Sequence, residues 1–194
     1  MIKAIFHEIK PALVTLVIFS FLTGLIYPGL VTCVAQLFFP WKANGSIIEK
    51  NGNQVGSLLI GQSFIEDNYF YSRPSATSPF PYNGESSSGS NMGPSNPDFL
   101  KAIKERTNQL QKTSLSHDLV PVDLVTASGS GLDPDISPLA AYYQVPRITK
   151  LRHLSEIEIK NLINKLTQER QLMIFGEPRV NVLQLNLGLD ELGK

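Results

Sequence analysis

The chain has 194 residues and a formal net charge of zero, with 17 basic residues against 17 acidic ones. No run or patch of Lys and Arg appears along it, so a nucleic-acid-binding role, which depends on cations facing phosphates, has no support. The one cysteine, Cys33, excludes an intrachain disulfide and a cysteine-rich metal site.

A membrane anchor is predicted near the N-terminus. No charged residue occurs from Pro11 to Trp41, and the run is apolar on every side, whereas a surface helix would keep one polar face. About 20 helical residues cross the ~30 Å of hydrocarbon in a bilayer, and this run supplies more. We expect Pro11 in the first turn of the helix, a kink or an end of the regular helix at Pro28, and Trp41 at the interface.

Three other interpretations of the apolar run compete with a retained span. A cleaved signal peptide would have a shorter apolar region, of about 7–15 residues, and an A-x-A-like cleavage site. A lipoprotein signal would use Cys33, but Thr32 is a poor residue before it. A buried core helix would be shorter. The orientation is not decided by charge, because lysines lie on both sides; the short tail makes a cytoplasmic N-terminus the default.

The segment after the span predicts a mixed domain of helices and strands. The chain is thus expected to have a short tail (1–10), a transmembrane and interfacial segment (11–41) and an α+β (mixed α/β) soluble domain (42–194). The Ser- and Pro-rich stretch 72–97 is either a flexible linker or a pinned loop. In the first half of the domain we expect a hairpin around the turn 51–53 with its second strand reaching Ile60, a helix over 97–111 and a β-rich run over 119–126. In its second half we expect a helix from Ser137 that Pro146 interrupts or ends, and a helix opened by the capping box of Ser155 and Glu158. A turn over 176–178 and a last strand over 180–187 follow.

Few residues suggest chemistry. Ser128, Gly129, Ser130 and Gly131 follow a predicted strand and precede a helix, so they could cradle a phosphate, but they lack a Walker ending and also suit a tight turn. Two other groups are weaker candidates: Asp133 and Asp135 could help bind a hard cation or could serve local turns and caps, and His7, His117 and His153 lack metal-ligand spacing. We find no nucleophile with a paired base, and we expect neither a catalytic nor a metal site in this chain.

A series of stretches along nearly the whole chain resembles the KdpC family, a subunit family of the bacterial potassium-transporting P-type ATPase. Lys10 stands where the family usually has Arg, which keeps the charge. The matching stretches are Lys10–Leu13, Thr23–Pro28, Phe39–Ser46, Gly56–Gln62, Tyr69–Phe70, Arg73–Ala76, Pro81–Asn83, Gly89–Asn91, Ser95–Pro97, Val120–Asp133, Ile136–Pro138, Gln144 with Arg147, and Pro178–Leu183.

The resemblance implies a non-catalytic accessory subunit of a high-affinity, ATP-driven potassium importer. Its partners would be a potassium-channel-like subunit, a P-type ATPase pump subunit and membrane lipid, with no nucleic acid. The family is described as a catalytic chaperone, which helps assembly and raises the affinity of the pump subunit for ATP. ATP and potassium would be handled by the complex, and we expect this chain alone to bind no cofactor.

The implied topology affects the ATP question. The family is placed in the bacterial inner membrane as a single-pass protein, with a cytoplasmic N-terminus and an extracytoplasmic domain. ATP is cytoplasmic, so this chain would raise the ATP affinity of the pump subunit only indirectly, through packing of its span against partner helices. The expected packing residues are Thr15, Ser20, Thr23 and Gly24, since small residues let membrane helices approach closely. The reversed orientation would instead favour a nucleotide site at Ser128–Gly131 with Gln144.

Two function classes compete with the accessory subunit. A membrane-tethered binding protein would use the Ser- and Pro-rich loop 72–97 for an external ligand. An anchored hydrolase would need an active serine in the isolated domain. The accessory subunit is the favoured interpretation, because the resemblance covers nearly all of the chain.

Overall fold

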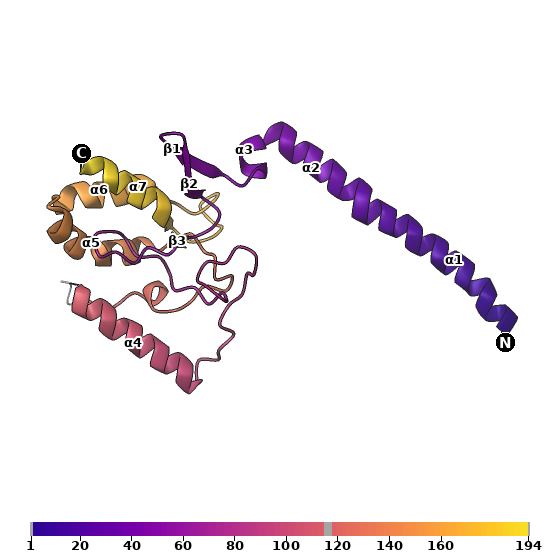
Figure 1. The fold of residues 1–194 in the computed structure, drawn as a ribbon, viewed down its shortest axis with the longest axis horizontal. Helices are drawn as coiled ribbons and strands as arrows, with labels where there is room; N and C mark the ends of the chain where they lie inside the picture. Colours follow the sequence, from indigo (N-terminus) through magenta and orange to yellow (C-terminus); the bar gives the residue numbers. More distant parts are fainter. Residues whose placement is uncertain (1, 115–117, 194) are drawn as a thin grey trace. The chain divides into compact units, whose positions relative to one another are not determined.

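The computed structural model describes residues 2–114 and 118–193, so His117 lies outside the described residues (Figure 1). The chain divides into two compact units, Met1–Ile47 and Ile48–Lys194, and each is described by itself. One long apolar helix and a domain of mixed helices and strands confirm the predicted fold class.

The first unit is a helical rod. It consists of α1 (Ile2–Phe21), a π-helical turn η1 (Leu22–Ile26), α2 (Tyr27–Phe38) and the short α3 (Pro40–Ala43). The regular α-helix is interrupted just before Pro28, by the π turn, and not at Pro28 itself, which lies in the first turn of α2. Pro28 has no N–H for an α-helical bond, and the preceding π turn, in which the Tyr27 N–H donates to the Leu22 carbonyl, changes the bonding pattern there.

The predicted position of Pro11 in the first helical turn is wrong. The helix begins at Ile2, so Pro11 lies inside α1. An interior proline leaves one carbonyl without its helical donor, yet its fixed φ suits a helix. Good helix formers such as Ala4 and Glu8 precede it and carry the helix back toward the N-terminus.

The predicted hairpin is confirmed as β1 (Ile47–Lys50) and β2 (Asn53–Ser57). Asn51 and Gly52 have positive φ values of 55° and 80°, the backbone that a two-residue hairpin turn with the twist of the strands requires. The second strand ends at Ser57, before the expected Ile60.

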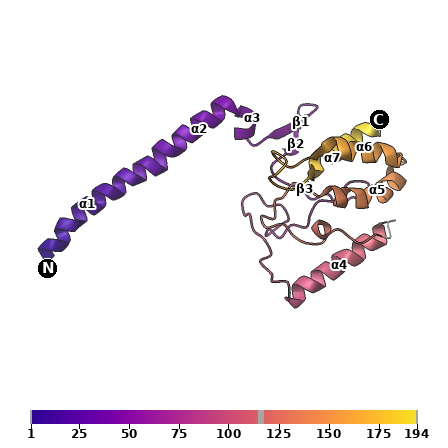
Figure 2. The same cartoon turned by 180° about the vertical axis from the view of Figure 1, so that it is seen from behind.

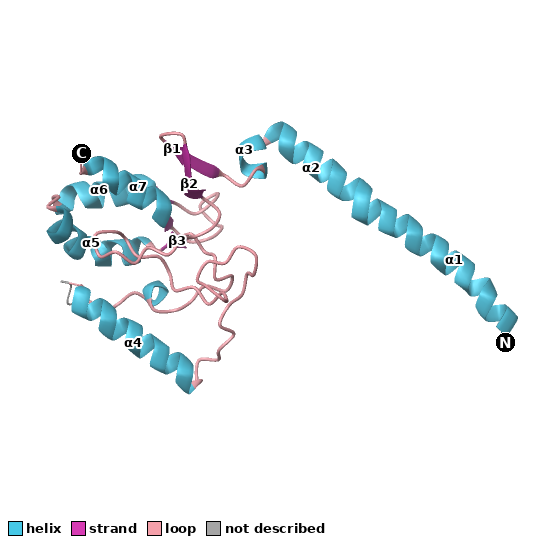
Figure 3. Cartoon of the chain, viewed as in Figure 1, coloured by secondary structure: helices cyan, strands magenta, loops and turns pink. Residues whose placement is uncertain are grey.

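The core of the second unit lies among three helices and a small antiparallel sheet (Figures 2 and 3). The sheet has the order β3-β5-β4, and its central strand pairs Val180 with both Ile136 and Thr167. The elements are β3 (Asp135–Ile136), α5 (Pro138–Arg152), α6 (Glu156–Leu166), β4 (Thr167–Gln168), β5 (Arg179–Asn181) and α7 (Val182–Leu192). The buried apolar side chains include Phe70, Leu124, Ile136, Val145, Ile148, Ile159, Ile163, Val180, Leu185 and Leu189.

Two expected features of these helices and strands are wrong. Pro146 neither ends nor interrupts α5, because Val145, Arg147 and Ile148 around it are buried and their packing holds the helix together. The expected last strand stops at Asn181, whose side chain accepts the Gln184 N–H at 3.1 Å and caps α7.

The capping box of Ser155 and Glu158 is confirmed: the Glu158 N–H donates to the Ser155 hydroxyl, and the Ser155 N–H donates to the Glu158 carboxylate. Gly176, in the expected turn before Pro178, has a positive φ of 78°.

The remaining half of the unit consists of long loops, α4 (Pro97–Thr113) and the 3-10 turn η2 (Val122–Leu124) (Figure 3). The predicted helix from Pro97 is confirmed and extends to Thr113, with the Asn96 side chain capping it through the Asp98 N–H. The predicted β-rich run over 119–126 is wrong, because η2 occupies it and Val122 is exposed.

The Ser- and Pro-rich stretch is a pinned loop over its first part. The Thr77 hydroxyl donates to the Phe80 carbonyl and accepts the Asn83 N–H, and both Thr77 and Asn83 are buried. The Ser75 hydroxyl donates to the Gly131 carbonyl at 2.7 Å, which ties the loop to a segment far away in the sequence. The loop is therefore part of the domain and not a free linker.

Candidate functional site

The surface of the first unit is the most apolar in the chain. A candidate membrane span runs over His7–Phe38, and none of its most apolar window is buried within the chain. An exposed helix of this length and composition is stable in hydrocarbon or against other helices, where its backbone bonds are satisfied internally. The rod therefore needs lipid or a partner to cover it.

The small residues proposed for helix packing lie in this rod. Thr15 and Ser20 are exposed in α1, and Thr23 and Gly24 belong to the π turn. The Thr23 hydroxyl donates to the Phe19 carbonyl at 2.7 Å, so its polar group is satisfied inside the helix. Nothing lies within 4 Å of a Cβ built on Gly24, so its surface is open to a neighbour. Their role in packing stays a prediction.

In the second unit, buried polar side chains fix the backbone of residues 67–71. Arg147 is 4% exposed and donates to the carbonyls of Asp67 and Tyr69. Its guanidinium also donates to the Gln144 side-chain oxygen at 2.7 Å and lies 4.0 Å from the centroid of the Tyr71 ring. Burial lowers the pKa of Arg147.

Amides from α5 and α7 complete this arrangement. The Gln144 oxygen accepts the Tyr71 N–H at 2.7 Å, and Asn186 both accepts the Phe70 N–H and donates to the Phe70 carbonyl. Because these polar groups are buried, each needs its partner, and together they fix the position of this irregular segment over the core. Gln144, a weak candidate for nucleotide binding, therefore has its side chain engaged by the chain's own backbone.

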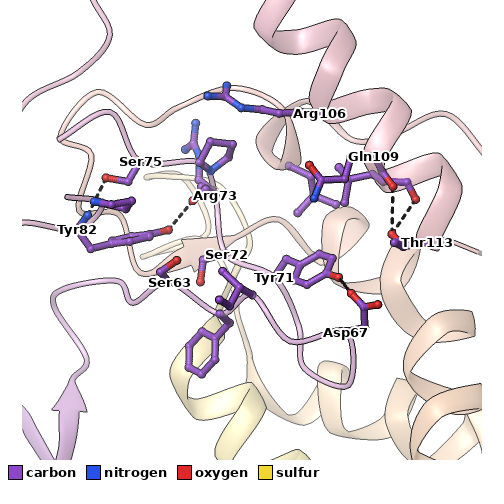
Figure 4. Close-up of a pocket in the computed structure, with 16 residues that line it drawn as sticks. Ser63, Asp67, Tyr71, Ser72, Arg73, Ser75, Tyr82, Arg106, Gln109 and Thr113 are labelled. Carbon is purple, nitrogen blue, oxygen red and sulfur yellow. Dashed lines mark hydrogen bonds between the residues drawn. The ribbon is translucent and has the colours of Figure 1, made fainter. Parts of the chain in front are cut away.

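An open cleft of about 350 Å³ lies beside this segment, between residues 63–82 and α4 (Figure 4). Arg73 on its wall pairs with Asp133 at 2.9 Å, and Arg106 from α4 donates to the Val125 carbonyl at 2.8 Å. The remaining donors of the Arg106 guanidinium could bind a small polar or anionic group. The lining also includes Ser63, Phe64, Asp67, Ser72, Pro74, Ser75, Pro81, Gln109, Leu110 and Thr113.

Burial raises the pKa of both tyrosines of the cleft. The Tyr82 hydroxyl donates to the Arg73 carbonyl, and burial raises the pKa of Tyr82 to about 12. The Tyr71 hydroxyl donates to the Asp67 carboxylate, and burial followed by this carboxylate raises the pKa of Tyr71. The Ser75 hydroxyl points to a backbone carbonyl, as does that of Ser72.

The loop Ser128–Gly131 packs against other loops. The Ser130 carbonyl accepts the Ser88 N–H at 2.9 Å and the Ser87 hydroxyl at 3.0 Å. Gly131 has a φ of 69°, and a Cβ there would lie 2.5 Å from the Ser88 carbonyl oxygen. The segment also lies before β3 and not at the N-terminus of α5, which begins at Pro138. Neither this loop nor Gln144 lines the cleft, and their nucleotide binding stays a prediction.

The two candidate aspartates serve the fold. Asp133 accepts the Asp135 N–H at 3.0 Å, the local turn that the sequence suggested. Asp135 pairs with Arg179 at 3.1 Å, while burial and the neighbouring Asp133 raise the pKa of Asp135. Among the described residues, no group of three or more His, Cys, Asp or Glu side chains could hold a metal ion.

The cleft residues Tyr71, Tyr82 and Arg106 were missed by sequence reasoning. The available signal was weak: aromatic residues in a Ser- and Pro-rich stretch, and one arginine on an exposed helix. These three residues meet only because the chain folds back on itself. The ion pair between Arg73, on the wall of the same cleft, and Asp133 likewise joins residues 60 positions apart. Spacing along the chain does not encode such a juxtaposition.

Within the residues that the structure describes, one candidate span and a mixed helix-and-sheet domain define the class: a membrane protein with an N-terminal anchor followed in the chain by a folded domain. The family model "K+-transporting ATPase, c chain" matches residues 9–191. The chain belongs to this family, KdpC, and is a subunit of a potassium-transporting ATPase complex.

The curated relatives cover nearly the whole chain. The potassium-transporting ATPase KdpC subunit of Herpetosiphon aurantiacus is 54% identical over 184 residues, which are 94% of this chain and 95% of that protein. The KdpC subunit of Methylococcus capsulatus is 54% identical over 187 residues, 96% of this chain and 98% of its own. The KdpC subunit of Dechloromonas aromatica is 51% identical over the same number, 187 residues.

Proposed function

We propose that the chain is a non-catalytic accessory subunit of a high-affinity, ATP-driven potassium importer in the bacterial inner membrane. The family match over residues 9–191 carries this proposal. The exposed apolar helix His7–Phe38 supports it, because a helix without cover inside its own chain needs lipid or neighbouring helices around it. A potassium-channel-like subunit and a P-type pump subunit are the proposed neighbours, and they would carry the ion path and the phosphorylated site.

The proposed topology places the N-terminus in the cytoplasm and the domain from residue 42 onward outside. In this orientation the domain and cytoplasmic ATP are on opposite sides of the membrane. The chain then assists assembly and raises the ATP affinity of the pump subunit indirectly, by holding one arrangement of the membrane helices. Coupling of this kind requires only that the span packs better against the ATP-competent state of its neighbours.

The span is the part to test. Gly24→Leu adds a branched side chain to a surface that is open in the isolated chain, so the helix itself tolerates it. We expect a tagged variant to retain fewer partner subunits in detergent, and the complex that still forms to show a higher KM for ATP. Gly29→Leu, at another uncrowded glycine of the rod, is the matched control for a change in bulk alone.

Two results would contradict the proposal. One is purification of the wild-type chain as a lone monomer whenever the other subunits are co-expressed. The other is an unchanged KM for ATP when the chain is removed from an otherwise assembled complex. Protease treatment of sealed spheroplasts tests the topology separately, since external cleavage must reach the domain and spare the N-terminal tail.

The cleft favours one second candidate, a membrane-tethered binding protein for a small external ligand. Its volume of about 350 Å³, with Arg106 and Tyr82 in its wall, is at the lower end of the range of ligand pockets. A ligand that raises the melting temperature of the purified chain without partners would support this function. Loss of that shift in Arg106→Ala would assign it to the cleft.

A further inference from the structure

The loop between β4 and β5 exposes four consecutive large apolar side chains. Leu172, Met173, Ile174 and Phe175 are 80%, 90%, 72% and 62% exposed. This segment, the apolar tip, lies in the loop that joins two paired antiparallel strands of the sheet. Contiguous exposed apolar surface of this kind marks a site of interaction, because leaving it in water is unfavourable.

The apolar tip is held in one conformation. The N–H and carbonyl of Gln171 are hydrogen-bonded to the carbonyl and N–H of Phe175, both at 2.9 Å. Arg170 and Glu177 form an ion pair across the base of the loop. Leu172 and Met173 have φ values of 51° and 61°, a left-handed backbone that non-glycine residues seldom adopt. Strain of this kind persists where the surroundings fix it and is concentrated at binding sites.

This rigidity favours a protein pocket over lipid as the occupant. A bilayer is fluid and gains nothing from a fixed backbone, whereas a pocket of fixed shape binds a preorganised loop more tightly. The flanking residues also differ from those of a membrane-binding loop: Glu169 and the paired Arg170 stand where Trp, Tyr or unpaired Lys would be expected.

We propose that the apolar tip inserts into an apolar pocket on another subunit of the potassium-transporting complex, with Met173 as its most deeply inserted side chain. The inference rests on the proposed function, because the partner is a subunit of that complex. A flexible thioether chain adapts to an irregular pocket, and a few such anchors carry most of the affinity of an interface. The pocket would lie on the same side of the membrane as the domain.

Photo-crosslinking in the assembled complex tests this contact. Met173 is replaced by benzoyl-phenylalanine in the full chain, which is expressed together with its partner subunits. Membranes that contain the assembled complex are then isolated and irradiated. We expect a product that joins the chain to one larger subunit. Ile157, which is 71% exposed on α6 and lies between Glu156 and Glu158, is replaced in the same way as the matched control and should give at least fivefold less of that product.

The outcomes separate this inference from the proposed function. If the partners co-purify but the probe at position 173 reacts with lipid, with a second copy of the chain or with nothing, the tip is not the contact, and the accessory role stands. If no partner co-purifies with the wild-type chain, the proposed function fails first. A second variant, Leu172→Ser with Met173→Ser, should leave the melting temperature unchanged and reduce partner retention about tenfold, as the loss of one or two interface anchors does.

Discussion

The two units differ in where their apolar side chains lie. Those of the rod, which consists of α1, η1 and α2, face outward, whereas the domain from Ile48 onward packs apolar side chains into a core. In the rod, Leu16, Phe19 and Leu25 are exposed, and no other part of the chain covers them. In the domain, Phe70, Leu185 and Leu189 are fully covered by other parts of the same unit. The first unit therefore depends on its surroundings, and the second contains its own core.

The comparison shows where each kind of mutation should act. Substitutions in the domain change its free energy of unfolding, since core and polar network lie within it. Substitutions of apolar residues in the rod change what the chain assembles with, since these side chains are exposed and not buried in a core of the chain. Hydrogen exchange on the full chain in detergent micelles reports the stability of the domain without removing the anchor.

The largest expected effect follows from the buried guanidinium. Arg147→Ala leaves the carbonyls of Asp67 and Tyr69 and the Gln144 oxygen without this donor, so we expect a loss of about 3–5 kcal/mol in unfolding free energy. Faster exchange over residues 67–71 would report it. Arg170→Ala, which removes a more exposed ion pair, should cost under ~1 kcal/mol. Equal losses would show that the network does not hold the segment.

A core truncation compares the two units directly. Leu185→Ala opens a cavity beside fully buried neighbours and should cost about 2–5 kcal/mol, measured as faster exchange in α5 and α7. Leu25→Ala removes the same atoms from the rod and should leave exchange in the domain unchanged. A domain destabilised by Leu25→Ala would mean that the units are not energetically separate.

A smaller effect is expected at the loop Ser128–Gly131. Gly131→Ala places a Cβ 2.5 Å from the Ser88 carbonyl oxygen, on a backbone with a φ of 69°. We therefore expect the unfolding free energy, measured by denaturant titration, to fall by about 1–3 kcal/mol. Gly129→Ala is the control, because nothing lies within 4 Å of its added Cβ. If both variants are equally stable, the loop is not packed as described.

The smallest effect is a pH dependence of the domain. The pKa of Tyr82 is raised to about 12 in the folded chain, above the ordinary value of 10.0. The neutral hydroxyl is therefore favoured by folding, so its contribution is complete below about pH 10 and is lost as pH rises toward 12. After allowance for the partial exposure of Tyr82, we expect the unfolding free energy of the wild type to fall by ~1–2 kcal/mol more than that of Tyr82→Phe as the pH rises from about 10 to about 12. Parallel stability curves would contradict the assignment.

Local signals account for the parts of the fold that were predicted correctly. Asn51-Gly52 required a hairpin turn, Asn96-Pro97 opened a helix, and Ser155 with Glu158 formed a capping box. The errors fall where distant packing decides between local alternatives. Val180–Leu187 alternates like a strand, yet Val182, Leu185 and the following Leu189 have helical spacing and are buried, and the Asn181 cap selects the helix.

The sequence alone determined the anchor, because an uncharged run of this length is stable only in hydrocarbon or against other helices, whatever the rest of the chain does. It also determined the family through residues spread over the whole chain. Only the tertiary structure decided the cleft, the network around Arg147 and the preorganised apolar tip. Their groups lie far apart in sequence or adopt unusual backbone angles, and both depend on contacts that form when the domain packs.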